Sequence, residues 1–588
     1  MSDTLEQKTS QPEFSNKLVY FLALIFVALG IINSTPLIPG WDELWRGITG
    51  IEKLKTRTFP TEWFYPIIFS LMMLLVALQH SMWKTWKGTS KALFGAFMDI
   101  ALVVSAVAVS LTYLIEIDSV CLIDLMSGER ARIMAETLKA EIEFAKTMGL
   151  PEPDTVDDPK CVSTTGVGLV VIMAFSLIVF LGYNIKVWGF PLVAISLGIA
   201  AYTIITVLVW YFHGPDGINK YLMTKLGGEP RTFLDGVPNV HDALVNNASG
   251  FLGRFMHVIM NVVFPYIILG ALFGKSAGGQ TLIKLAFRWT RKLRGGPAHA
   301  AIISSAMFGT ITGGPVVNVL STGVLTIPMM IKRGFSRVFA GGMEAAASSG
   351  GSIMPPVMGV AAFILAAMTA VPYRDVIIAA TLPALAYFLC LFLSASFQSR
   401  KQGIDAFGEL TEEMRISGQD VLHLCQIVLP MLLILILLLT PKDIVGCGFL
   451  ASLFGAEAVI ENGRCTVIYL PWVFQIFQNA AGDAGSTGWW AAALVAILLF
   501  LDKDFRSKPS KLLDALAESG ITIATLYLMF LAVTVIDVCL NFTGLSKFVA
   551  IDVLRFLLSF DLGSDGSFFF QFFALVMTML LAVLLGMG

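Results

Sequence analysis

Residues 309–318 read GTITGGPVVN and residues 348–359 read SSGGSIMPPVMG, and both stretches lie inside otherwise apolar sequence. Glycine and proline at this density interrupt the hydrogen-bond ladder of a helix and leave main-chain carbonyl and amide groups without partners. In hydrocarbon such groups are tolerated only when they are buried in protein or line a polar cavity. We therefore interpret the two stretches as breaks in membrane helices that form a solute or ion site.

The composition around these breaks predicts a membrane protein. Of the 588 residues, 56% are hydrophobic and 14% are charged, and the mean hydropathy is +0.77. One soluble core would not hold so many apolar side chains. A spanning helix needs about 20 apolar residues, and the recurrence of such runs predicts roughly ten or more crossings. The net charge of -2 argues against nucleic-acid binding.

The first six spans are predicted at residues 18–32, 63–78, 93–115, 167–183, 191–212 and 251–273. Short loops rich in Lys and Arg stay in the cytoplasm. With the N-terminus inside, the basic clusters at 84–91 and 275–294 fall on the same side of the membrane. The segment 116–164 then lies outside, and its apolar stripe predicts an amphipathic helix that starts near Gly128 and ends at 149–151.

Cysteine positions bear on this topology. Cys121 and Cys161 bracket the outer segment, while Cys447 and Cys465 bracket a second polar connection. On the oxidising side of the membrane each pair is expected to form a disulfide. The alternative is four unpaired loop thiols, because a sequence does not define connectivity.

The two broken stretches also carry side-chain oxygens. These belong to Thr310, Thr312, Asn318, Thr322, Ser348, Ser349 and Ser352. For any one of them close helix packing is the simpler explanation, since small and hydroxyl residues also join membrane helices. Two dense clusters in neighbouring segments favour a binding site for the segments as a whole.

Longer motifs resemble the large membrane subunit of TRAP transporters, specifically the fused TAXI type. The motifs are GKSAGGQ, RGGPAHAA, GTITGGPVVNVLSTG, TIPMMIKRGF and FAGGMEAAASSGGSIMPPVMG within residues 273–362, with LNFTGL at 540–545 and LGMG at 585–588. The likeness covers most of the chain after about residue 230.

This resemblance implies an all-α, polytopic membrane protein with re-entrant hairpins and broken helices, which works as an elevator-type transporter. Residues 1–188 would be a small-subunit-like (Q-type) domain, 189–234 a connecting helix and periplasmic linker, and 235–588 a large-subunit-like (M-type) transport domain. The chain ends at Gly588 inside an apolar run, where relatives continue with a second hairpin. We therefore expect that residues 1–588 alone do not transport.

The implied function is import of a small organic anion, a carboxylate, delivered by a periplasmic TAXI-type binding protein and driven by a Na⁺ or H⁺ gradient. No cofactor is expected beyond a coupling Na⁺, and the protein is expected not to be an enzyme. It would be a multi-pass protein of the bacterial inner membrane, surrounded by the lipid bilayer, with a cytoplasmic N-terminus.

By motif, the resemblance assigns residues to an ion and substrate pocket. The first hairpin would contribute Thr310, Thr312 and Asn318, and the broken helix would contribute Ser349, Gly350, Gly351, Met354 and Pro355. Thr310, Thr312 and Pro315 stand where serines and a small residue are more usual, so the hydroxyl oxygens are kept but the backbone at Pro315 departs from the pattern.

Glu344 is a further candidate, because it lies within the apolar stretch 339–347. An acid inside the membrane is costly and indicates a function by default. Proton coupling is one interpretation, and a structural ion pair with Arg337, Arg333 or Lys332 is the other. Asp99 and Asp537 raise the same question more weakly, since neither lies in a broken-helix motif.

Two other classes of membrane protein remain as alternatives. A quinone or haem redox subunit would need histidines facing each other across spans, and of the six histidines only His257 is expected inside a span. An ion channel would also use re-entrant glycine-rich segments, but the chain lacks the repeated short filters of that class.

Overall fold

The computed structural model describes residues 17–50, 56–148, 165–213, 222, 239–245, 250–369, 371–406, 408, 415–442, 445–447, 453–461, 464–558 and 571–577. The chain folds into two compact units, and each is assembled from segments that are distant in sequence. Unit 1 consists of residues 1–59 and 257–523, and unit 2 of residues 60–256 and 524–588. Residues far apart along the chain therefore share each core.

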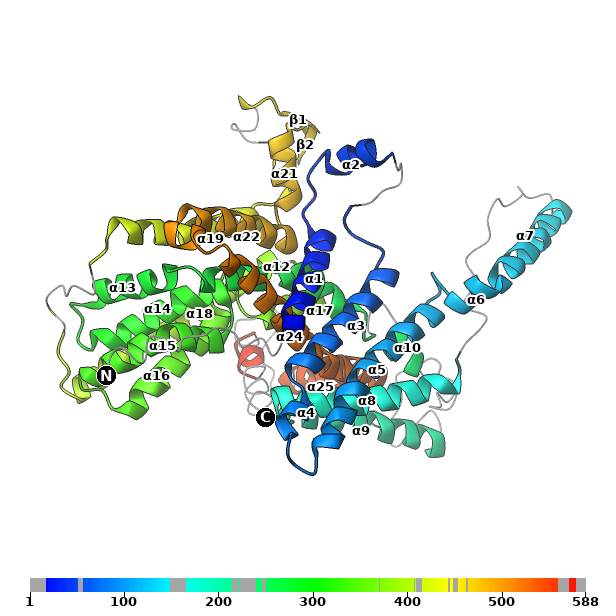
Figure 1. Ribbon diagram of the computed structural model, residues 1–588, viewed down its shortest axis with the longest axis horizontal. Coiled ribbons are helices and arrows are strands. Elements are labelled where there is room, and N and C mark those ends of the chain that lie inside the picture. The colour runs from blue at the N-terminus through cyan, green and yellow to red at the C-terminus, as the bar shows by residue number, and fades with distance from the viewer. Residues whose placement is uncertain are drawn as a thin grey trace. The chain divides into compact units, whose positions relative to one another are not determined.

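Helices dominate the described chain (Figure 1), and 11 of them are long and apolar enough to cross a membrane. This finding confirms the predicted all-α polytopic class and the expected number of crossings. Each of the six predicted segments overlaps an observed span. Those spans are Lys17–Ser34, Thr61–Trp86, Ala92–Glu116, Val167–Trp188, Phe190–His213 and Arg254–Gly274.

Unit 1 holds both broken stretches. Its elements are α1 (Lys17–Ser34), α2 (Trp41–Thr49), the π-helix η2 (Ile259–Val263), α12 (Phe264–Gly274), α13 (Gly278–Thr290), α14 (Gly296–Thr312), α15 (Pro315–Lys332), α16 (Arg337–Gly350), the 3-10 turn η3 (Gly351–Ile353), α17 (Val360–Thr369), α18 (Tyr373–Lys401), α19 (Gly418–Leu439), β1 (Glu457–Glu461), β2 (Arg464–Tyr469), α21 (Trp472–Ala480), α22 (Ala484–Leu501), α23 (Lys503–Arg506) and the start of α24 (Ser510–Thr543). Helix α14 packs against α13, α15, α16 and α18, which appear in Figure 1 as the group of green helices.

Unit 2 contains the remaining elements. They are α3 (Thr61–Gln79), α4 (Met82–Trp86), α5 (Ala92–Glu116), α6 (Leu122–Ser127), α7 (Glu129–Met148), α8 (Val167–Trp188), α9 (Phe190–His213), α10 (Asn239–Val245), most of α11 (Arg254–Val258), the rest of α24 and α25 (Leu545–Leu558). Buried polar side chains join its helices. Asn184 Nδ2 donates to the carbonyl of Leu528 at 2.8 Å, and Ser196 Oγ donates to that of Ala532 at 3.1 Å. Such bonds hold α8 and α9 to α24.

The amphipathic helix predicted after span three is confirmed as α7, and the short helix α6 precedes it. Gly128, with a φ of 73°, joins the two helices in a left-handed turn that suits glycine. The predicted end of the helix at residues 149–151 lies outside the described residues.

One element departs from the all-helical expectation. Strands β1 and β2 form an antiparallel pair in which Ile460 lies opposite Cys465. The sequence signal was the Asn-Gly dipeptide at 462–463, flanked by runs rich in β-branched residues, and this is a strong hairpin pattern. The dipeptide itself lies outside the described residues. This short polar connection was not among the predicted spans.

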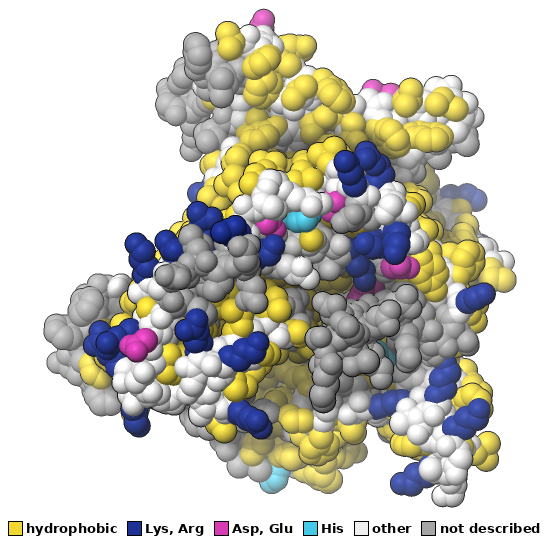
Figure 2. All heavy atoms as spheres, turned by 60° about the vertical axis from the view of Figure 1, so that its left-hand side comes forward, with side chains coloured by type: hydrophobic (Ala, Val, Ile, Leu, Met, Phe, Trp, Pro, Cys, Tyr) yellow, Lys and Arg dark blue, Asp and Glu magenta, His cyan; other side chains and the backbone are white. Residues whose placement is uncertain are grey.

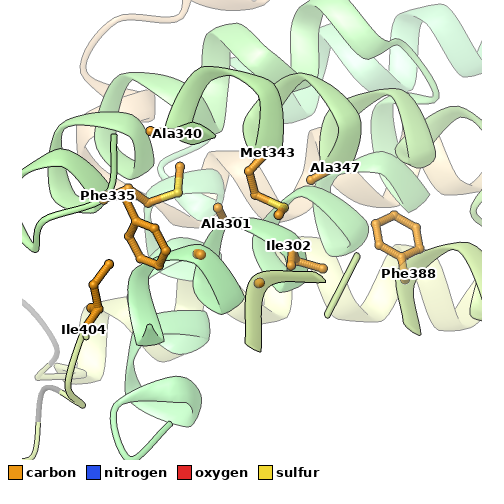
Figure 3. Packing of buried hydrophobic residues seen from close by; sticks show 11 residues of the cluster. Ala301, Ile302, Phe335, Ala340, Met343, Ala347, Phe388 and Ile404 are labelled. Atoms are coloured by element: carbon orange, nitrogen blue, oxygen red, sulfur yellow. The ribbon is translucent and has the colours of Figure 1, made fainter. Parts of the chain in front are cut away.

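A hydrophobic cluster supports the broken stretches within unit 1. Its buried members are Ala298, Ala301, Ile302, Met330, Phe335, Ala340, Met343, Ala347, Phe388, Ala395 and Ile404. Figure 3 shows Ala301 and Ile302 near Met343, with Phe388 at one end of the group and Phe335 and Ile404 at the other. The small residues in this cluster allow α14, α16 and α18 to approach closely.

The described surface is rich in apolar side chains, which cover much of the face drawn in Figure 2. In the most apolar 18-residue stretch of α18 only 17% is buried, and Leu382 on this helix is 75% exposed. Helices with this much exposed apolar surface are suited to contact with lipid.

Candidate functional site

The first broken stretch is a helical hairpin formed by α14 and α15. Helix α14 ends at Thr312 because Gly313 adopts a left-handed φ of 60°, and its N–H donates to the carbonyl of Gly309 at 3.0 Å. Gly314 is extended, and Pro315 then opens α15 at a position where a missing N–H costs nothing. This geometry places Asn318 in the first turn of α15, close to the break.

The second broken stretch starts in α16 and ends in α17. After Gly350 the chain forms the 3-10 turn η3, becomes extended at Met354 and starts α17 at Val360. The hydroxyl of Tyr373 lies 3.1 Å from the carbonyl of Pro356 and 2.5 Å from that of Val357. A side chain from α18 therefore provides a hydrogen-bond donor for main-chain carbonyls that have no helical partner at the break.

The two breaks touch each other through their main chains. A Cβ atom added to Gly309 would lie 2.2 Å from Cα of Gly351, and one added to Gly313 would lie 1.9 Å from the carbonyl oxygen of Met358. Only glycine permits these approaches without a shift of the backbone. The structure thus brings together the two sequence stretches from which a site was predicted.

Asn318 ties these segments together and is fully buried. Its Nδ2 donates to the carbonyl of Ser305 on α14 at 2.8 Å and lies 3.5 Å from that of Ser348 on α16. Its Oδ1 is buried and has no hydrogen-bond partner among the described residues. A buried amide oxygen without a donor is unusual.

Glu344 lies beside this junction and is 1% exposed. Four hydroxyl groups surround its carboxylate. Thr322 donates to Oε1, Thr326 to Oε2 at 2.5 Å, and Ser305 and Ser348 lie 3.2 and 3.3 Å from Oε1. Among the described residues no basic side chain forms an ion pair with Glu344. The carboxylate contacts hydroxyl groups instead of the Lys or Arg that a structural ion pair would require.

Other predicted residues lie at the junction but use their polar groups locally. The hydroxyl of Thr310 donates to Met307 O at 2.7 Å, and that of Thr312 to Phe308 O at 3.2 Å. Ser349 is exposed and donates to Ala345 O at 2.8 Å. These bonds run within one helix, so the three hydroxyls do not converge on a common point in this structure.

The predicted glycines and the residues after them fill backbone roles. A Cβ at Gly351 would lie 2.6 Å from Asn318 Nδ2, and one at Gly350 would lie 2.4 Å from a ring carbon of Tyr387. Met354 is partly buried against the hydrophobic cluster, and Pro355 follows it in the extended part of the break. The assignment of these residues to an ion and substrate pocket stays a prediction.

Sequence reasoning missed two members of the hydroxyl cage around Glu344, namely Ser305 and Thr326. A signal was present in α15, because Asn318, Thr322 and Thr326 recur every four residues and therefore share one face of the helix. The cage residue on α14 had no comparable signal. It lies in an apolar run and meets Glu344 only through the fold.

Asp99, the acid left open in unit 2, connects α5 to α4. It accepts bonds from the amides of Met82 and Trp83 at 2.7 and 3.2 Å, from Ser81 Oγ at 2.5 Å and from the hydroxyl of Tyr183. These partners give Asp99 a structural role. Asp537 accepts a bond from Asn541 Nδ2 at 3.0 Å one turn later in α24.

Comparison with known proteins places this chain in a family. Residues 167–588, well over half of the chain, match the family described as "Tripartite ATP-independent periplasmic transporter, DctM component". The chain belongs to this family. Its members are transporter components, which confirms the predicted class of protein, and this DctM-family permease is a multi-pass membrane protein.

Individual relatives are distant. The permease is 26% identical over 196 residues to "Uncharacterized protein y4mL" of Sinorhizobium fredii, covering 33% of this chain and 46% of that protein. It is 24% identical over 229 residues to the C4-dicarboxylate TRAP transporter large permease protein DctM of Vibrio cholerae, covering 39% and 43%. It is 29% identical over 145 residues to the isethionate TRAP transporter permease protein DctMQ of Oleidesulfovibrio alaskensis, covering 25% and 22%. The matched region spans less than half the length of each relative.

The histidine expected inside a span bears on the redox alternative. His257 lies in α11, and its Nδ1 is 3.0 Å from Nδ2 of Asn261 in the π-helix η2. In the described part of the chain no three His, Cys, Asp or Glu side chains cluster as metal ligands would. The family match assigns the permease to a transporter class instead.

Proposed function

We propose that this permease is the membrane component of a tripartite secondary active transporter. It imports an organic anion, a carboxylate, which a soluble periplasmic binding protein of the TAXI type delivers, and a Na⁺ or H⁺ gradient drives the import. The names of two relatives support an organic anion, since one is a C4-dicarboxylate permease and the other an isethionate permease. The first of these names supports a carboxylate, whereas isethionate is a sulfonate.

The contact between the two breaks is the observation that carries this proposal. Main-chain groups around Gly309, Gly313, Gly351 and Met358 meet at one point inside a unit of apolar helices. A helix that starts at Pro315 presents free amides, which attract anions, and broken segments present carbonyls, which attract cations. A site of this kind can hold a carboxylate and its coupling ion together.

The finer assignments are part of the same proposal. Asn318, Thr310 and Thr312 on the hairpin, and the segment 349–355 on the broken helix, would contact the ion or the solute after a rearrangement of their hydroxyls. Residues 1–188 would correspond to a small subunit fused to a large one, with residues 189–234 connecting them. The protein would lie in the bacterial inner membrane with its N-terminus in the cytoplasm.

Uptake by the complete transporter in proteoliposomes tests the proposal. The permease and its binding protein would be supplied with radiolabelled succinate or isethionate, while Na⁺ and pH gradients are imposed one at a time. We expect accumulation above the outside concentration that requires both the binding protein and one of the gradients. Accumulation without the binding protein, or equilibration without concentration, would contradict a tripartite secondary transporter.

A further inference from the structure

We propose that Glu344 is a proton-binding site, whose cage of hydroxyl groups accommodates both the carboxylate and the carboxylic acid. The inference rests on the proposed function in one respect, because it makes the proton the coupling ion of the transporter. The proton-binding site itself rests on the contacts of Glu344 alone.

The surroundings of Glu344 contain hydroxyls rather than charges. Burying an ion without compensation costs several kcal/mol, on the order of what a whole domain can spare, so the carboxylate depends on its donors. The titratable groups on the packed elements are His299 on α14, Lys332 on α15, Arg337 on α16, and Tyr373, Arg374, Asp375, Tyr387, Cys390, Arg400 and Lys401 on α18. None of them is within ion-pair or hydrogen-bond distance of Glu344.

Two of these groups are held elsewhere by their own bonds. His299 on α14 lies 2.9 Å from Ser396 Oγ and 3.1 Å from the carbonyl of Gly295. The hydroxyl of Tyr387 on α18 donates to the carbonyl of Ala346 at 2.9 Å. The groups in contact with Glu344 are therefore hydroxyls rather than charged side chains.

In the ionised state every caging hydroxyl can turn its single proton to the carboxylate. Oε1 then accepts from Thr322, Ser305 and Ser348, and Oε2 accepts from Thr326. Bonds to a charged acceptor are stronger than bonds between neutral groups. The anion is therefore satisfied without a cation.

In the protonated state the same hydroxyls have second acceptors already in place. Thr322 Oγ1 lies 2.8 Å from the carbonyl of Asn318, and Thr326 Oγ1 lies 3.0 Å from that of Thr322. Such bonds to the carbonyl four residues earlier are common for threonine in helices. When the two threonines turn to these carbonyls, the new O–H of Glu344 can donate to a vacated threonine oxygen.

The chemical step is a simple protonation. On release of the proton, the O–H bond of the Glu344 carboxylic acid breaks, the electron pair stays on the carboxylate, and the proton passes to water. Proton binding reverses this step. No oxidant, reductant or further reactant takes part. The two threonines exchange one acceptor for another, and Ser305 and Ser348 can donate to Oε1 in both states. Neither state therefore leaves one of these buried groups unpaired.

Sodium fits these contacts less well than a proton. Thr322 and Thr326 touch the carboxylate directly, and a Cβ at Gly323 would lie only 3.1 Å from Cγ of Glu344. A cation placed between the carboxylate and the hydroxyl oxygens would have to separate groups that are already in contact. A proton needs no additional volume.

The cage also connects to the junction of the two breaks. The second acceptor of Thr322 is the carbonyl of Asn318, whose side chain binds the carbonyls of Ser305 and Ser348. Protonation of Glu344 therefore changes a bond to the residue that joins the hairpin to the broken helix. Through these bonds, proton binding at Glu344 can affect the contact between the hairpin and the broken helix.

Infrared difference spectroscopy of the purified full-length protein tests the proton site directly. Spectra recorded across a pH titration, in H₂O and in D₂O, report the carbonyl band of a protonated carboxyl group. We expect a band that appears on acidification, is absent from Glu344→Gln and is retained in Glu136→Gln, an exposed acid on α7. Titrations in sodium chloride and in choline chloride should give the same midpoint.

A second variant guards against misfolding of the first. Thr326→Val keeps the side-chain shape and removes one donor to the carboxylate, which disfavours the anion. The midpoint of the Glu344 band should move to higher pH by about one unit or more. A band that survives in Glu344→Gln, a midpoint unmoved in Thr326→Val, or a midpoint that depends on sodium would overturn the proposal.

A transport measurement separates this inference from the proposed function. In the proteoliposome assay with succinate, Glu344→Gln should retain solute counterflow, which needs no net proton movement, and should lose at least tenfold of the accumulation driven by a pH gradient. If the unaltered transporter shows no uptake, the proposed function fails while the infrared result still decides the proton site. Full pH-driven accumulation by Glu344→Gln would exclude Glu344 as the coupling group.

Discussion

At the scale of single residues, the absence of a side chain matters as much as its presence. Gly309 and Gly351 belong to different elements, and a Cβ at Gly309 would fall 2.2 Å from Cα of its neighbour. The obstruction is main chain, which cannot swing aside as a flexible side chain would. One methyl group at this position must therefore displace the hairpin from the broken helix.

We predict that Gly309→Ala destabilises the protein by about 1–3 kcal/mol, the usual cost of overpacking, and reduces uptake. Thermal unfolding in detergent measures the first effect and the proteoliposome assay the second. Gly342→Ala is the matched control, since it lies in α16 and a Cβ there meets nothing within 4 Å. Alanine favours a helix over glycine, so the control should melt at the same temperature or slightly higher. Equal melting of the two variants would show that the contact does not constrain the fold.

Sequence reasoning selected the two stretches that the structure brings together, but it did not predict how their side chains bond. It selected Asn318 and Glu344, because a polar group in an apolar run demands an explanation. It could not tell that Thr310 bonds to its own helix whereas Thr326 bonds to Glu344 across to the next helix. A threonine in a helix has both options, and only the packing of neighbours decides between them.

At the scale of secondary-structure elements, Asp99 holds the short helix α4 on the end of α5. Its carboxylate accepts bonds from the amides of Met82 and Trp83 and from the hydroxyls of Ser81 and Tyr183. A helix of five residues is too short to persist without such support. A close approach completes the contact, since a Cβ at Gly95 would lie 2.8 Å from the main chain of Met82.

We predict that Asp99→Ala releases α4 and lowers stability by about 1.5–3 kcal/mol, the range for hydrogen bonds to a charged group. Amide hydrogen exchange should rise across residues 82–86. Tyr183→Phe is the milder comparison, because it removes one donor and leaves the two amide bonds intact. Protection of residues 82–86 that is unchanged in Asp99→Ala would contradict this role.

Spans were predictable as elements, whereas their connections were not. Long apolar runs have a simple physical cause in the thickness of hydrocarbon. The hairpin of β1 and β2 depends instead on a two-residue turn signal and a short alternating pattern. Neither of these signals is a long apolar run. Asp99 remained unexplained for a different reason, because its partners are main-chain groups and a tyrosine 84 residues away.

At the scale of the whole molecule, the predicted topology can be tested at two exposed lysines. Lys87 lies between α4 and α5, and Lys139 lies on α7. We predict that Lys139→Cys reacts with a membrane-impermeant maleimide in intact cells and that Lys87→Cys reacts only after the membrane is opened. Labelling is compared with that of the parent protein, which has seven cysteines of its own. The reverse pattern would invert the proposed orientation.

The same topology places two cysteine pairs on the oxidising side. Non-reducing peptide mapping should find Cys121 linked to Cys161, and Cys447 linked to Cys465. Cys390, Cys425 and Cys539 are free thiols in the structure and should be alkylated after unfolding. Cys161 and the side chain of Cys465 lie outside what the structure describes, so the pairing stays a prediction. Unlinked peptides from an unreduced sample would refute it.

The main-chain contact between Gly313 and the carbonyl of Met358 restricts how this region can move. Sliding the hairpin by one residue in one direction would bring the side chain of Thr312 into a gap that admits only hydrogen. The close main-chain contact therefore fixes the register of the hairpin relative to the broken helix. We therefore expect the two segments to move together in any large displacement of this region.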